Sequence, residues 1–505
     1  MVWAYTAAAI WVQFTLEHHS ARYFWCDLCL TNNNDAQSGS LEEQRVKPLK
    51  QHTIWGLRGS FILAATGSAV GLGNIWKFPY ITGENGGGAF VLMYLLCIAV
   101  IGIPIMMAEI LMGRRARANP IMATAELCEH AGASKAWTGI GWMGVLAGLL
   151  ILSFYSVIAG WTLEYALAAL DGKFAGLTGE TSQALFDGLL ADSDLMLQWH
   201  SLFIAMTVAV LALGVTRGLE SAVRWMMPLL FVLLLILLGY AIKEGEFVTS
   251  LRFMFSFKLE DLSWEGAQIA MGHSFFTLSL GMGAIMAYGA YMPSNQSVGK
   301  TVVIVAILDT LVALVAGVAI FAFVFATPGI SPGAGPGLMF VTLPVAFGNM
   351  GAGLVIGSVF FVMVILAAWT STISLLEPGV AYLNERFGLH RIFASLLLGT
   401  ISWFIGLGSV FSFNDWSELQ FLWGKNFFDS MDFIATNIML PLGGVLIALF
   451  TGWKLRDEII LHDLKFESAW VFRLWRPVLK FISPIAVLVI LYNGIFPVLR
   501  AVFVE

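Results

Sequence analysis

Three residues near the middle of one apolar stretch could bind a hard cation. Ala367, Thr370 and Ser371 stand at positions i, i+3 and i+4, so one face of a helix would present a backbone carbonyl and two hydroxyls. Oxygen atoms are the ligands that hard cations prefer. Alternatively, the two hydroxyls only donate back to carbonyls of their own helix. What lies opposite this face decides between the two interpretations.

Two Gly-x-Gly sequences could supply further oxygen atoms. They are Gly71-Leu72-Gly73 and Gly281-Met282-Gly283, and each lies in a long apolar segment. Glycines that serve helix packing are spaced four apart, not two, so close packing is the less favoured explanation. A helix interrupted inside a membrane releases backbone groups that protein, cavity water or a ligand must satisfy. Each sequence therefore predicts a broken helix at a binding site.

The elements that position these groups must be membrane helices, because the composition excludes a soluble protein. Of the 505 residues, 58% are hydrophobic and 12% are charged, whereas an ordinary soluble domain has about 25% charged residues. A chain this apolar could not cover its surface in water. No basic block suggests a nucleic-acid partner. The four Cys residues, which include a lone Cys26-x-x-Cys29, do not form a disulfide framework or a zinc motif.

Uncharged segments that are long enough to cross a bilayer predict an all-α protein with about eleven transmembrane helices. The stretch from Thr310 to Leu376 contributes two, because a Pro- and Gly-rich sequence at 327–337 divides it. The other predicted spans lie at 59–76, 85–108, 136–163, 195–216, 225–242, 266–299, 392–414, 433–453 and 481–499.

The positions of the two interruptions favour an internal repeat. They fall in the first and sixth spans, which is typical of a five-plus-five inverted repeat with discontinuous helices 1 and 6 and a ligand at the breaks. The expected boundaries are about 58–242 for repeat one, about 264–453 for repeat two and about 481–499 for an extra helix.

Lys and Arg residues set the predicted orientation. They gather in the loops and helix ends on the side where the first span begins, and they are fewer on the other side. The positive-inside rule therefore places the N-terminus in the cytoplasm. Residues 1–50 do not match the rest of the chain. We expect a disordered tail or an over-long start there, with an interfacial helix as the alternative.

The sequences around the two breaks resemble the neurotransmitter:sodium symporter family. The resemblance runs from about Trp55 to the end of the chain, so residues 51–505 are expected to form the transporter domain. The matching sequences are Trp55-Gly-Leu-Arg-Gly59, Gly71-Leu-Gly-Asn-Ile-Trp-Lys-Phe-Pro-Tyr80, Glu84-Asn-Gly-Gly-Gly-Ala-Phe90, Gly102-Ile-Pro104, Thr277-Leu-Ser-Leu-Gly281 and Ala367-Ala-Trp-Thr-Ser-Thr372.

The family resemblance implies two sodium sites. The second site (Na2) would be formed by backbone carbonyls of the first broken helix and by the face described above, that is by Gly67, Val70, Ala367, Thr370 and Ser371. The first site (Na1) would be shared with the substrate carboxylate and would be formed by Ala69, Asn74, Thr277 and Asp309.

Asp309 is an acid inside an apolar segment, which makes it a functional candidate by default. Many family members have Asn at this position and balance the charge with chloride or a second acid. Here the residue one turn further on is the neutral Ala313. We infer that Asp309 supplies the negative charge, so that transport does not require chloride.

The resemblance also implies an amino-acid substrate. Its α-carboxylate is expected at the backbone amides of Gly71, Leu72 and Gly73 and at the Tyr155 hydroxyl, because free amides at a helix N-terminus bind anions. Monoamine transporters of the family have an Asp where this chain has Gly71, which leaves room for the carboxylate. Together with Thr277, the side-chain pocket would be formed by Ile151, Phe276, Ser279, Met282 and Leu375. All of these except Thr277 and Ser279 are apolar, and the deformable Met282 could admit an aromatic ring.

Several charged or polar residues match the gates of the family. Lys77 and Asp432 correspond to the outer pair, with Phe276 as the lid, and Glu109 to an acid that braces the broken helices. Tyr291 and Glu385 correspond to the inner latch, where His52 replaces the usual Arg and Lys50 is a second possible partner. Gly218 and Pro228 resemble a motif at which the fifth helix unwinds.

The sequence thus predicts a sodium-coupled symporter that imports a neutral, hydrophobic or aromatic L-amino acid by alternating access. It would be a multi-pass protein of the inner (plasma) membrane, surrounded by lipid, as a monomer or weak dimer. The alternative is an amino-acid sensor or an uncoupled, channel-like relative of the same fold. An intramembrane enzyme is not expected, because no nucleophile–base pair or metal cluster stands out.

Overall fold

The computed structural model describes residues 58–328, 337–464 and 469–504. The expectations for residues 1–50 and for His52 lie outside these ranges. Within them the regular structure is helical, apart from one isolated bridge between Leu422 and Lys425. The predicted all-α membrane fold is confirmed.

Nine stretches of helix in the described ranges are long and apolar enough to cross a membrane. Three of them are composite, because a short π-helical turn joins two α-helices. These are α4 (Gly88–Cys97) with α5 (Ile103–Ala116), α18 (Phe427–Asp432) with α19 (Leu440–Leu449), and α21 (Ala469–Pro477) with α22 (Ser483–Val504). The others are α7 (Gly139–Leu170), α9 (Ser193–Ala212), α10 (Ser221–Glu244), α14 (Val298–Ala326), α16 (Gly353–Phe387) and α17 (Arg391–Phe411).

Two further spans are discontinuous, as the glycine pairs predict. The first consists of α2 (Arg58–Ala69) and α3 (Phe78–Glu84), with an interruption at 70–72 and a π-helical segment, Gly73–Lys77, in between. The second consists of α12 (Trp264–Thr277) and α13 (Ala284–Tyr291), with an interruption at 278–283. Nine continuous spans and two broken ones account for the eleven predicted. The exact limits of the two repeats stay a prediction.

One expectation about helix limits is wrong. The run at 266–299 is not one span, because α13 ends at Tyr291 and the next span, α14, begins at Val298. The loop between them contains Pro293 but no charged residue. Because the predicted spans were defined as uncharged runs, this loop was included in one of them. The motif that Gly218 and Pro228 resemble, at which the fifth helix unwinds, stays a prediction. A π-helical turn, Val215–Glu220, leads into α10, which continues through Pro228.

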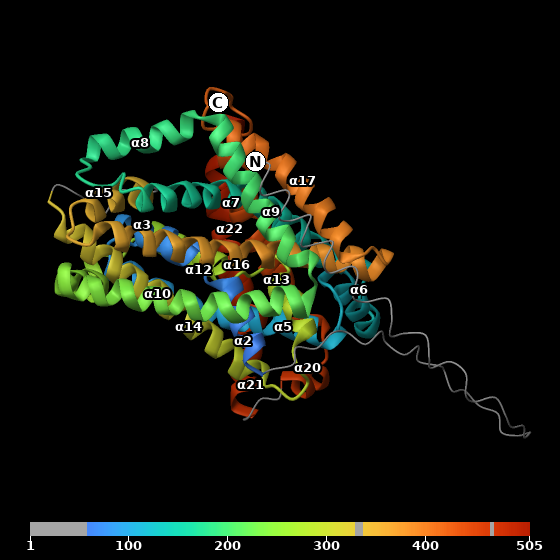
Figure 1. Ribbon diagram of the computed structural model, residues 1–505. Helices are drawn as coiled ribbons and strands as arrows, with labels where there is room; N and C mark the ends of the chain where they lie inside the picture. Colours follow the sequence, from blue (N-terminus) through green and yellow to red (C-terminus); the bar gives the residue numbers. More distant parts are fainter. Residues whose placement is uncertain (1–57, 329–336, 465–468, 505) are drawn as a thin grey trace, which may run out of the picture. The chain divides into compact units, whose positions relative to one another are not determined.

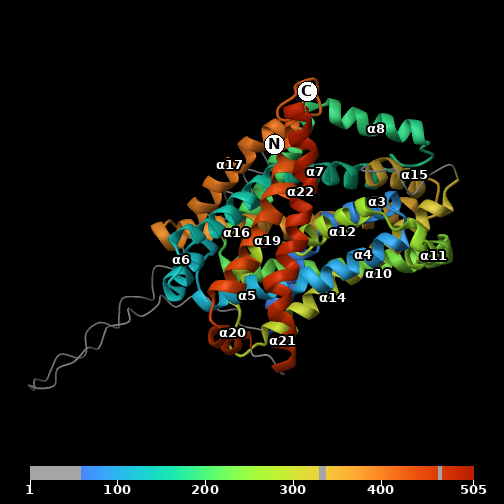
Figure 2. The ribbon, with the colours of Figure 1, turned by 180° about the vertical axis from the view of Figure 1, so that it is seen from behind.

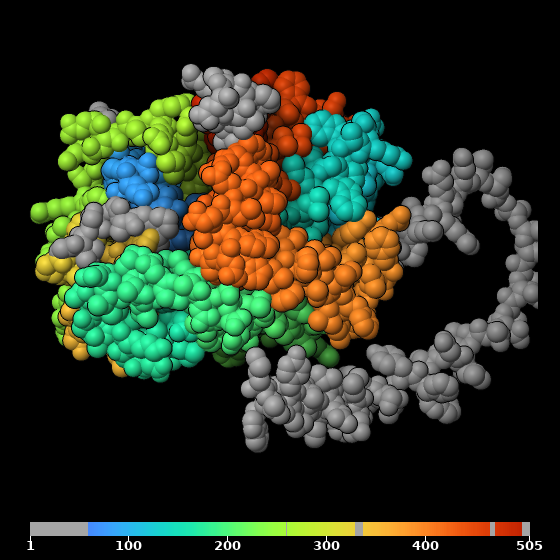
Figure 3. All heavy atoms as spheres, turned by 90° about the horizontal axis from the view of Figure 1, so that it is seen from above, coloured from blue at the N-terminus to red at the C-terminus, as the bar shows by residue number. Residues whose placement is uncertain are grey.

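The long helices pack on one another so that residues far apart in sequence surround the breaks. α16 packs against α7, and α10 packs against both α14 and α16. The broken helix α2 contacts α10, α14 and α16, and α13 contacts α5. In Figure 3 the early part of the chain, in blue, reaches the surface between green and orange segments from the middle and late chain.

Short helices lie at the two ends of the long ones (Figures 1 and 2). One end carries α8 (Gly179–Ala191), α11 (Phe247–Phe255) and α15 (Leu343–Gly348), and the opposite end carries α6 (Pro120–Ala131) and α20 (Asp457–Leu464). Prolines at the first turns of α6 and α15 suit helix starts, where no intrahelical donor is needed.

Candidate functional site

A cavity lies where the two broken helices meet. The empty space at this place, including its part that is open to solvent, is about 320 Å³. Its lining comes from both interruptions and from the middle of α7 and α16, namely from Ser68, Ala69, Gly71, Gly73, Ile151, Tyr155, Phe276, Thr277, Ser279, Met282, Ser371, Ser374 and Leu375. This lining contains every residue that was predicted to bind the substrate except Leu72.

The first break carries backbone amides that are held by side chains. Leu72 N donates to Tyr155 Oη at 2.9 Å, and Gly71 N donates to Asn74 Oδ1 at 3.0 Å. A Cβ on Gly71 would overlap Ser371 Oγ and would lie 2.8 Å from Tyr155 Oη. Glycine therefore keeps a space open between α7 and α16 at the N-terminal end of the following helix, which is a suitable place for an anion.

The second break has a backbone conformation that few residues other than glycine adopt. Ser279, Gly281 and Gly283 have φ values of 54°, 77° and 73°, a region that favours glycine. Glu109 Oε1 of α5 accepts a hydrogen bond from Gly281 N at 2.5 Å. Ser279 Oγ donates to Ser68 O at 2.7 Å, which links the two breaks directly. The predicted brace is thus a side-chain acceptor for a released amide.

A buried polar cluster joins the first break to α12 and α14. Asn74 Nδ2 donates to Asp309 Oδ1 at 2.8 Å and to Thr277 Oγ1 at 3.0 Å. Thr277 Oγ1 lies 3.1 Å from Asp309 Oδ2. All three side chains are at most 1% exposed. The structure therefore brings together three of the four residues predicted for the first sodium site, and the fourth, Ala69, lines the adjoining cavity.

The residues predicted for the second sodium site also meet. Ser371 Oγ lies 3.4 Å from Val70 O, and a Cβ on Gly67 would lie 3.5 Å from Thr370 Cβ. Thr370 Oγ1 donates to Ala367 O at 3.0 Å, within its own helix. The alternative of back-bonding hydroxyls therefore describes Thr370, whereas Ser371 points across to the broken helix.

A vestibule adjoins the cavity on the side of α3 and α18. Its empty space, including the part open to solvent, is about 1050 Å³. The lining is strongly aromatic, with Trp76, Tyr80, Phe154, Trp161, Phe186, Phe340, Phe413 and Phe428. Lys77, Asp432 and Leu72 line it as well. Among the described residues no ion pair joins Lys77 to Asp432. Instead, Lys77 Nζ lies 5.1 Å from the ring centroid of Phe276, which lines both the vestibule and the cavity.

The opposite end of the site is held by a buried ionic group. Tyr291 Oη donates to Glu377 Oε1 at 2.7 Å, and Arg391 forms an ion pair with the same carboxylate. Glu385 Oε2 accepts hydrogen bonds from Asn119 N at 2.9 Å and Asn119 Nδ2 at 2.6 Å. Tyr291 and Glu385, the two residues predicted for the inner latch, thus have partners among the described residues that the sequence analysis did not assign. Their predicted partner His52 lies outside the described residues, so the latch stays a prediction.

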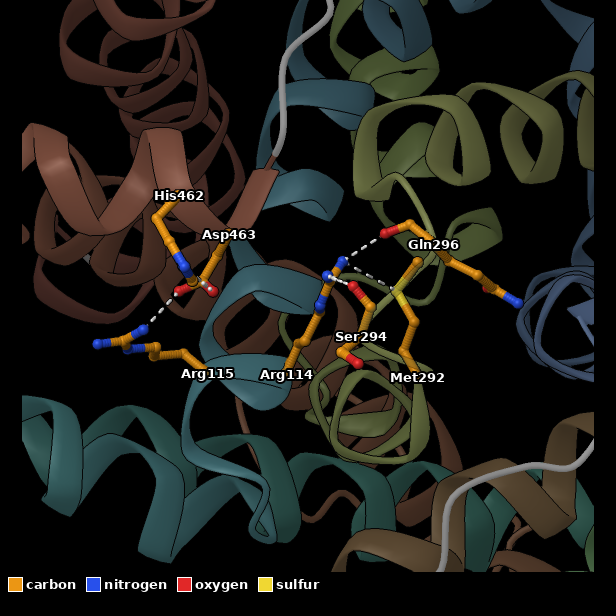
Figure 4. Close-up of polar contacts among 7 residues, drawn as sticks. All are labelled: Arg114, Arg115, Met292, Ser294, Gln296, His462 and Asp463. Atoms are coloured by element: carbon orange, nitrogen blue, oxygen red, sulfur yellow. Dashed lines mark hydrogen bonds and ion pairs between the residues drawn. The ribbon is translucent and has the colours of Figure 1, made fainter.

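Two arginines at the end of α5 secure the segment after α13. Arg114 donates to the carbonyls of Ser294 and Gln296 at 2.7 Å each, and Arg117 donates to Ala290 O at 3.0 Å. Figure 4 shows that Arg115 points away from this group, toward Asp463 of α20, at 3.3 Å. The second half of the second broken helix is therefore fixed to α5.

The sequence analysis missed two hydroxyls in the cavity, those of Ser68 and Ser374. Both belong to segments that it had identified, and helical spacing could have found them. Ser374 stands at i+4 from Thr370 and i+3 from Ser371, so it continues their face of α16. Ser68 is the last but one residue of α2.

Comparisons with known proteins place this geometry in a family. Residues 52–182 and 190–502 match the model of the sodium:neurotransmitter symporter family. An uncharacterized sodium-dependent transporter of Bacillus subtilis, YhdH, is 35% identical over 442 residues, which cover 87% of this chain and 97% of YhdH. Another from Haemophilus influenzae is 32% identical over 88% of this chain and 99% of its own length. The solved structure of MhsT in complex with L-phenylalanine superposes with a TM-score of 0.81 and 43% identity, over 88% of this chain and 99% of MhsT.

Proposed function

Because the chain belongs to the sodium:neurotransmitter symporter family and is a sodium-dependent symporter of the multi-pass membrane type, we propose that it imports a neutral L-amino acid with a hydrophobic or aromatic side chain. The observation that carries this proposal is the cavity between the breaks. One end has the amides of the first break and Tyr155 Oη, and the rest is lined largely by Ile151, Met282 and Leu375.

The polar end of the cavity suits an α-carboxylate. The Tyr155 hydroxyl accepts from Leu72 N, so its own proton can be donated to a carboxylate that enters. The amides of Gly71 and Leu72 can join by exchanging their present acceptors, Asn74 and Tyr155, for the carboxylate. Gly71 is essential here, because a side chain would fill the space between Tyr155 and Ser371. The solved relative MhsT was crystallised with L-phenylalanine, which supports an aromatic amino acid for this chain too.

Sodium is proposed to bind at two sites beside the substrate. At the first site, Thr277 Oγ1 and Asp309 Oδ2 lie 3.1 Å apart, next to Ala69 and the carboxylate end of the cavity. Asn74 faces both side chains through its Nδ2, while its Oδ1 accepts from Gly71 N, so a rotation of the amide would offer the ion that oxygen. The substrate and the ion then share ligands, so binding of one organises the site for the other. At the second site, Val70 O and Ser371 Oγ face each other between α2 and α16.

Asp309 is proposed to make transport independent of chloride. It is fully buried, and the described structure gives it Asn74 and Thr277 as neutral partners, so a bound sodium ion would neutralise it. Two unit charges about 4 Å apart attract by about 4 kcal/mol at an effective dielectric constant of about 20. The carboxylate alone can therefore balance the ion.

Uptake of labelled L-phenylalanine into proteoliposomes tests this function. We expect uptake to require an inward sodium gradient and to change less than about twofold when gluconate replaces chloride. Asp309→Asn should weaken the apparent sodium affinity by roughly a hundredfold or more, whereas Asp194→Asn, at an exposed acid, should leave it unchanged. Loss of uptake without chloride would contradict the role of Asp309, and sodium-dependent binding without flux would indicate a sensor.

Orientation and location follow from the same proposal. The vestibule would face the outside and the Tyr291–Glu377–Arg391 group the cytoplasm, with the N-terminus inside and the protein in the plasma (inner) membrane, which agrees with the distribution of Lys and Arg. Lys77 and Asp432 would approach each other when the vestibule closes. Glu385 and Asn119 would separate when the cytoplasmic side opens.

A further inference from the structure

One hydroxyl that lines the substrate cavity has no hydrogen-bond partner. Ser68 Oγ lies on a side chain that is 3% exposed, and the described structure offers it neither donor nor acceptor. Serines in helices usually donate to a carbonyl one turn back, as Ser374 Oγ does to Ser371 O at 2.7 Å. A buried hydroxyl without a partner carries a desolvation penalty, which a bound partner removes.

The surroundings of Ser68 restrict what that partner can be. The cavity is lined by apolar residues such as Ile151, Met282 and Leu375 and, besides Ser68, by the polar side chains of Tyr155, Thr277, Ser279, Ser371 and Ser374. Tyr155 Oη accepts from Leu72 N, Thr277 Oγ1 bonds to Asp309, and Ser371 Oγ donates to Val70 O. Ser279 Oγ already donates its proton to Ser68 O, and Ser374 Oγ donates to Ser371 O. Ser68 is therefore the cavity hydroxyl whose donor and acceptor capacity are both unused.

A ligand that fits this lining has a large apolar body with one polar group at its edge. Tyrosine and tryptophan have this character, because their rings are apolar and their O–H or N–H group needs a partner when buried. Phenylalanine fills the same kind of space and offers no such group. In this cavity, tyrosine and tryptophan therefore differ from phenylalanine by a single hydrogen bond.

We propose that Ser68 Oγ reads a hydrogen-bonding group on the aromatic ring of the substrate, so that the protein prefers tyrosine or tryptophan to phenylalanine. This inference rests on the proposed function, because it assumes that the cavity holds the transported amino acid. Ser68 is then a specificity-determining residue. The α-carboxylate of the substrate is proposed to bind elsewhere, at the amides of the first break and Tyr155 Oη.

Competition binding on the full-length purified protein tests the proposal. Unlabelled tyrosine, tryptophan and phenylalanine are each titrated against labelled L-phenylalanine in a sodium-containing buffer. The same titrations in a potassium-containing buffer give the background. In the wild type, tyrosine or tryptophan should bind about tenfold more tightly than phenylalanine, as one neutral hydrogen bond provides. Ser68→Ala should remove most of that advantage and leave the phenylalanine affinity within about twofold.

A matched control lies on the same helix. Thr66 is fully buried, its hydroxyl also has no partner in the described structure, and it does not line the cavity. Thr66→Val removes a hydroxyl at nearly constant shape, so the ratio of tyrosine or tryptophan to phenylalanine affinity should stay as in the wild type. Melting temperatures of both variants show whether α2 remains folded. Should Ser68→Ala fail to fold, Ser68→Gly and Ser68→Cys provide the same comparison.

The possible outcomes separate this proposal from the function on which it rests. A wild type without preference, or a Ser68→Ala variant with the wild-type ratio, overturns the role of Ser68 while sodium-dependent phenylalanine binding still supports the transporter. An equal loss for all three ligands also overturns it, because the hydroxyl would then bind the common amino group. If none of the three binds in sodium, the proposed function itself is wrong.

Discussion

The two breaks share a Gly-x-Gly sequence but use their glycines for different purposes. In the first break, Gly71 and Gly73 do not have positive φ, and a Cβ on either would meet side-chain atoms, those of Ser371, Tyr155 and Phe276. In the second break, both glycines have positive φ, and a Cβ on Gly281 would lie 2.5 Å from the backbone oxygen of Leu440.

This difference shows that one break is open toward a ligand and the other is packed into the protein. The amides of the first break bond to side chains, Tyr155 and Asn74, which can exchange a partner for a ligand. The second break is anchored to α5 through Glu109, and α13 is so close to α5 that a Cβ on Gly113 would overlap Met286 O. Identical motifs can therefore serve binding in one place and backbone geometry in another.

Gly281→Ala should have the largest effect, and it should act on folding. The substitution places a side chain on a residue with φ 77° and brings its Cβ against Leu440 O. Leu440 O is a backbone atom, so it cannot rotate away from the clash as the end of a side chain can. We expect a loss of about 2–4 kcal/mol in stability from the positive φ and the overpacking together. The melting temperature in detergent measures it, and Gly73→Ala is the control, since its Cβ meets only the Phe276 ring, at 3.2 Å. Equal destabilisation of both variants would contradict the comparison.

Gly71→Ala should have a smaller effect on stability and a large effect on binding. The new methyl group competes with Ser371 Oγ and Tyr155 Oη, which are ends of side chains and can move. It also occupies the proposed place of the carboxylate, so sodium-dependent amino-acid binding should fall by about a hundredfold, or about 2.7 kcal/mol. Equilibrium binding with a labelled amino acid measures this. A variant with wild-type affinity would show that the first break is not the ligand-binding one.

Tyr155→Phe should have the smallest effect and would refine the description of the first break. It removes the acceptor of Leu72 N and the proposed donor to the carboxylate without changing the shape of the cavity. We expect the substrate affinity to fall about tenfold, as for one hydrogen bond to a charged group. Stability should fall by about 1 kcal/mol, because Leu72 N loses its acceptor. Titration of both proteins with the same ligand decides this, and an unchanged affinity would remove Tyr155 from the site.

Most of the fold could be predicted because apolar length and interrupted glycine motifs are local signals. All eleven spans were found in this way, including the two broken helices. The limit between α13 and α14 was not found, because Met292–Ser297 is uncharged and only its Pro293 and Asn295 marked a turn.

The candidate site was predictable to the extent that motifs carry it. The cluster of Asn74, Thr277 and Asp309 joins three helices, and its members were assigned through the family resemblance. Ser68 was missed because the pocket was considered residue by residue, and an unused hydroxyl becomes visible only when all its neighbours are known. The partners of Glu385 and Tyr291 were missed for the same reason, since Asn119 and Glu377 lie on different elements from the predicted ones.

The position of Lys77 has a consequence for how the vestibule closes. Its ammonium group lies over the Phe276 ring, so approaching Asp432 means exchanging a cation–π contact for an ion pair. The first is worth about 0.5–2 kcal/mol and the second, where it faces water, about 0–1 kcal/mol. The two arrangements therefore differ little in free energy. If Lys77 and Asp432 form the proposed outer gate, a vestibule balanced in this way would be sampled in both forms at rest, and occupancy of the cavity would decide which form predominates.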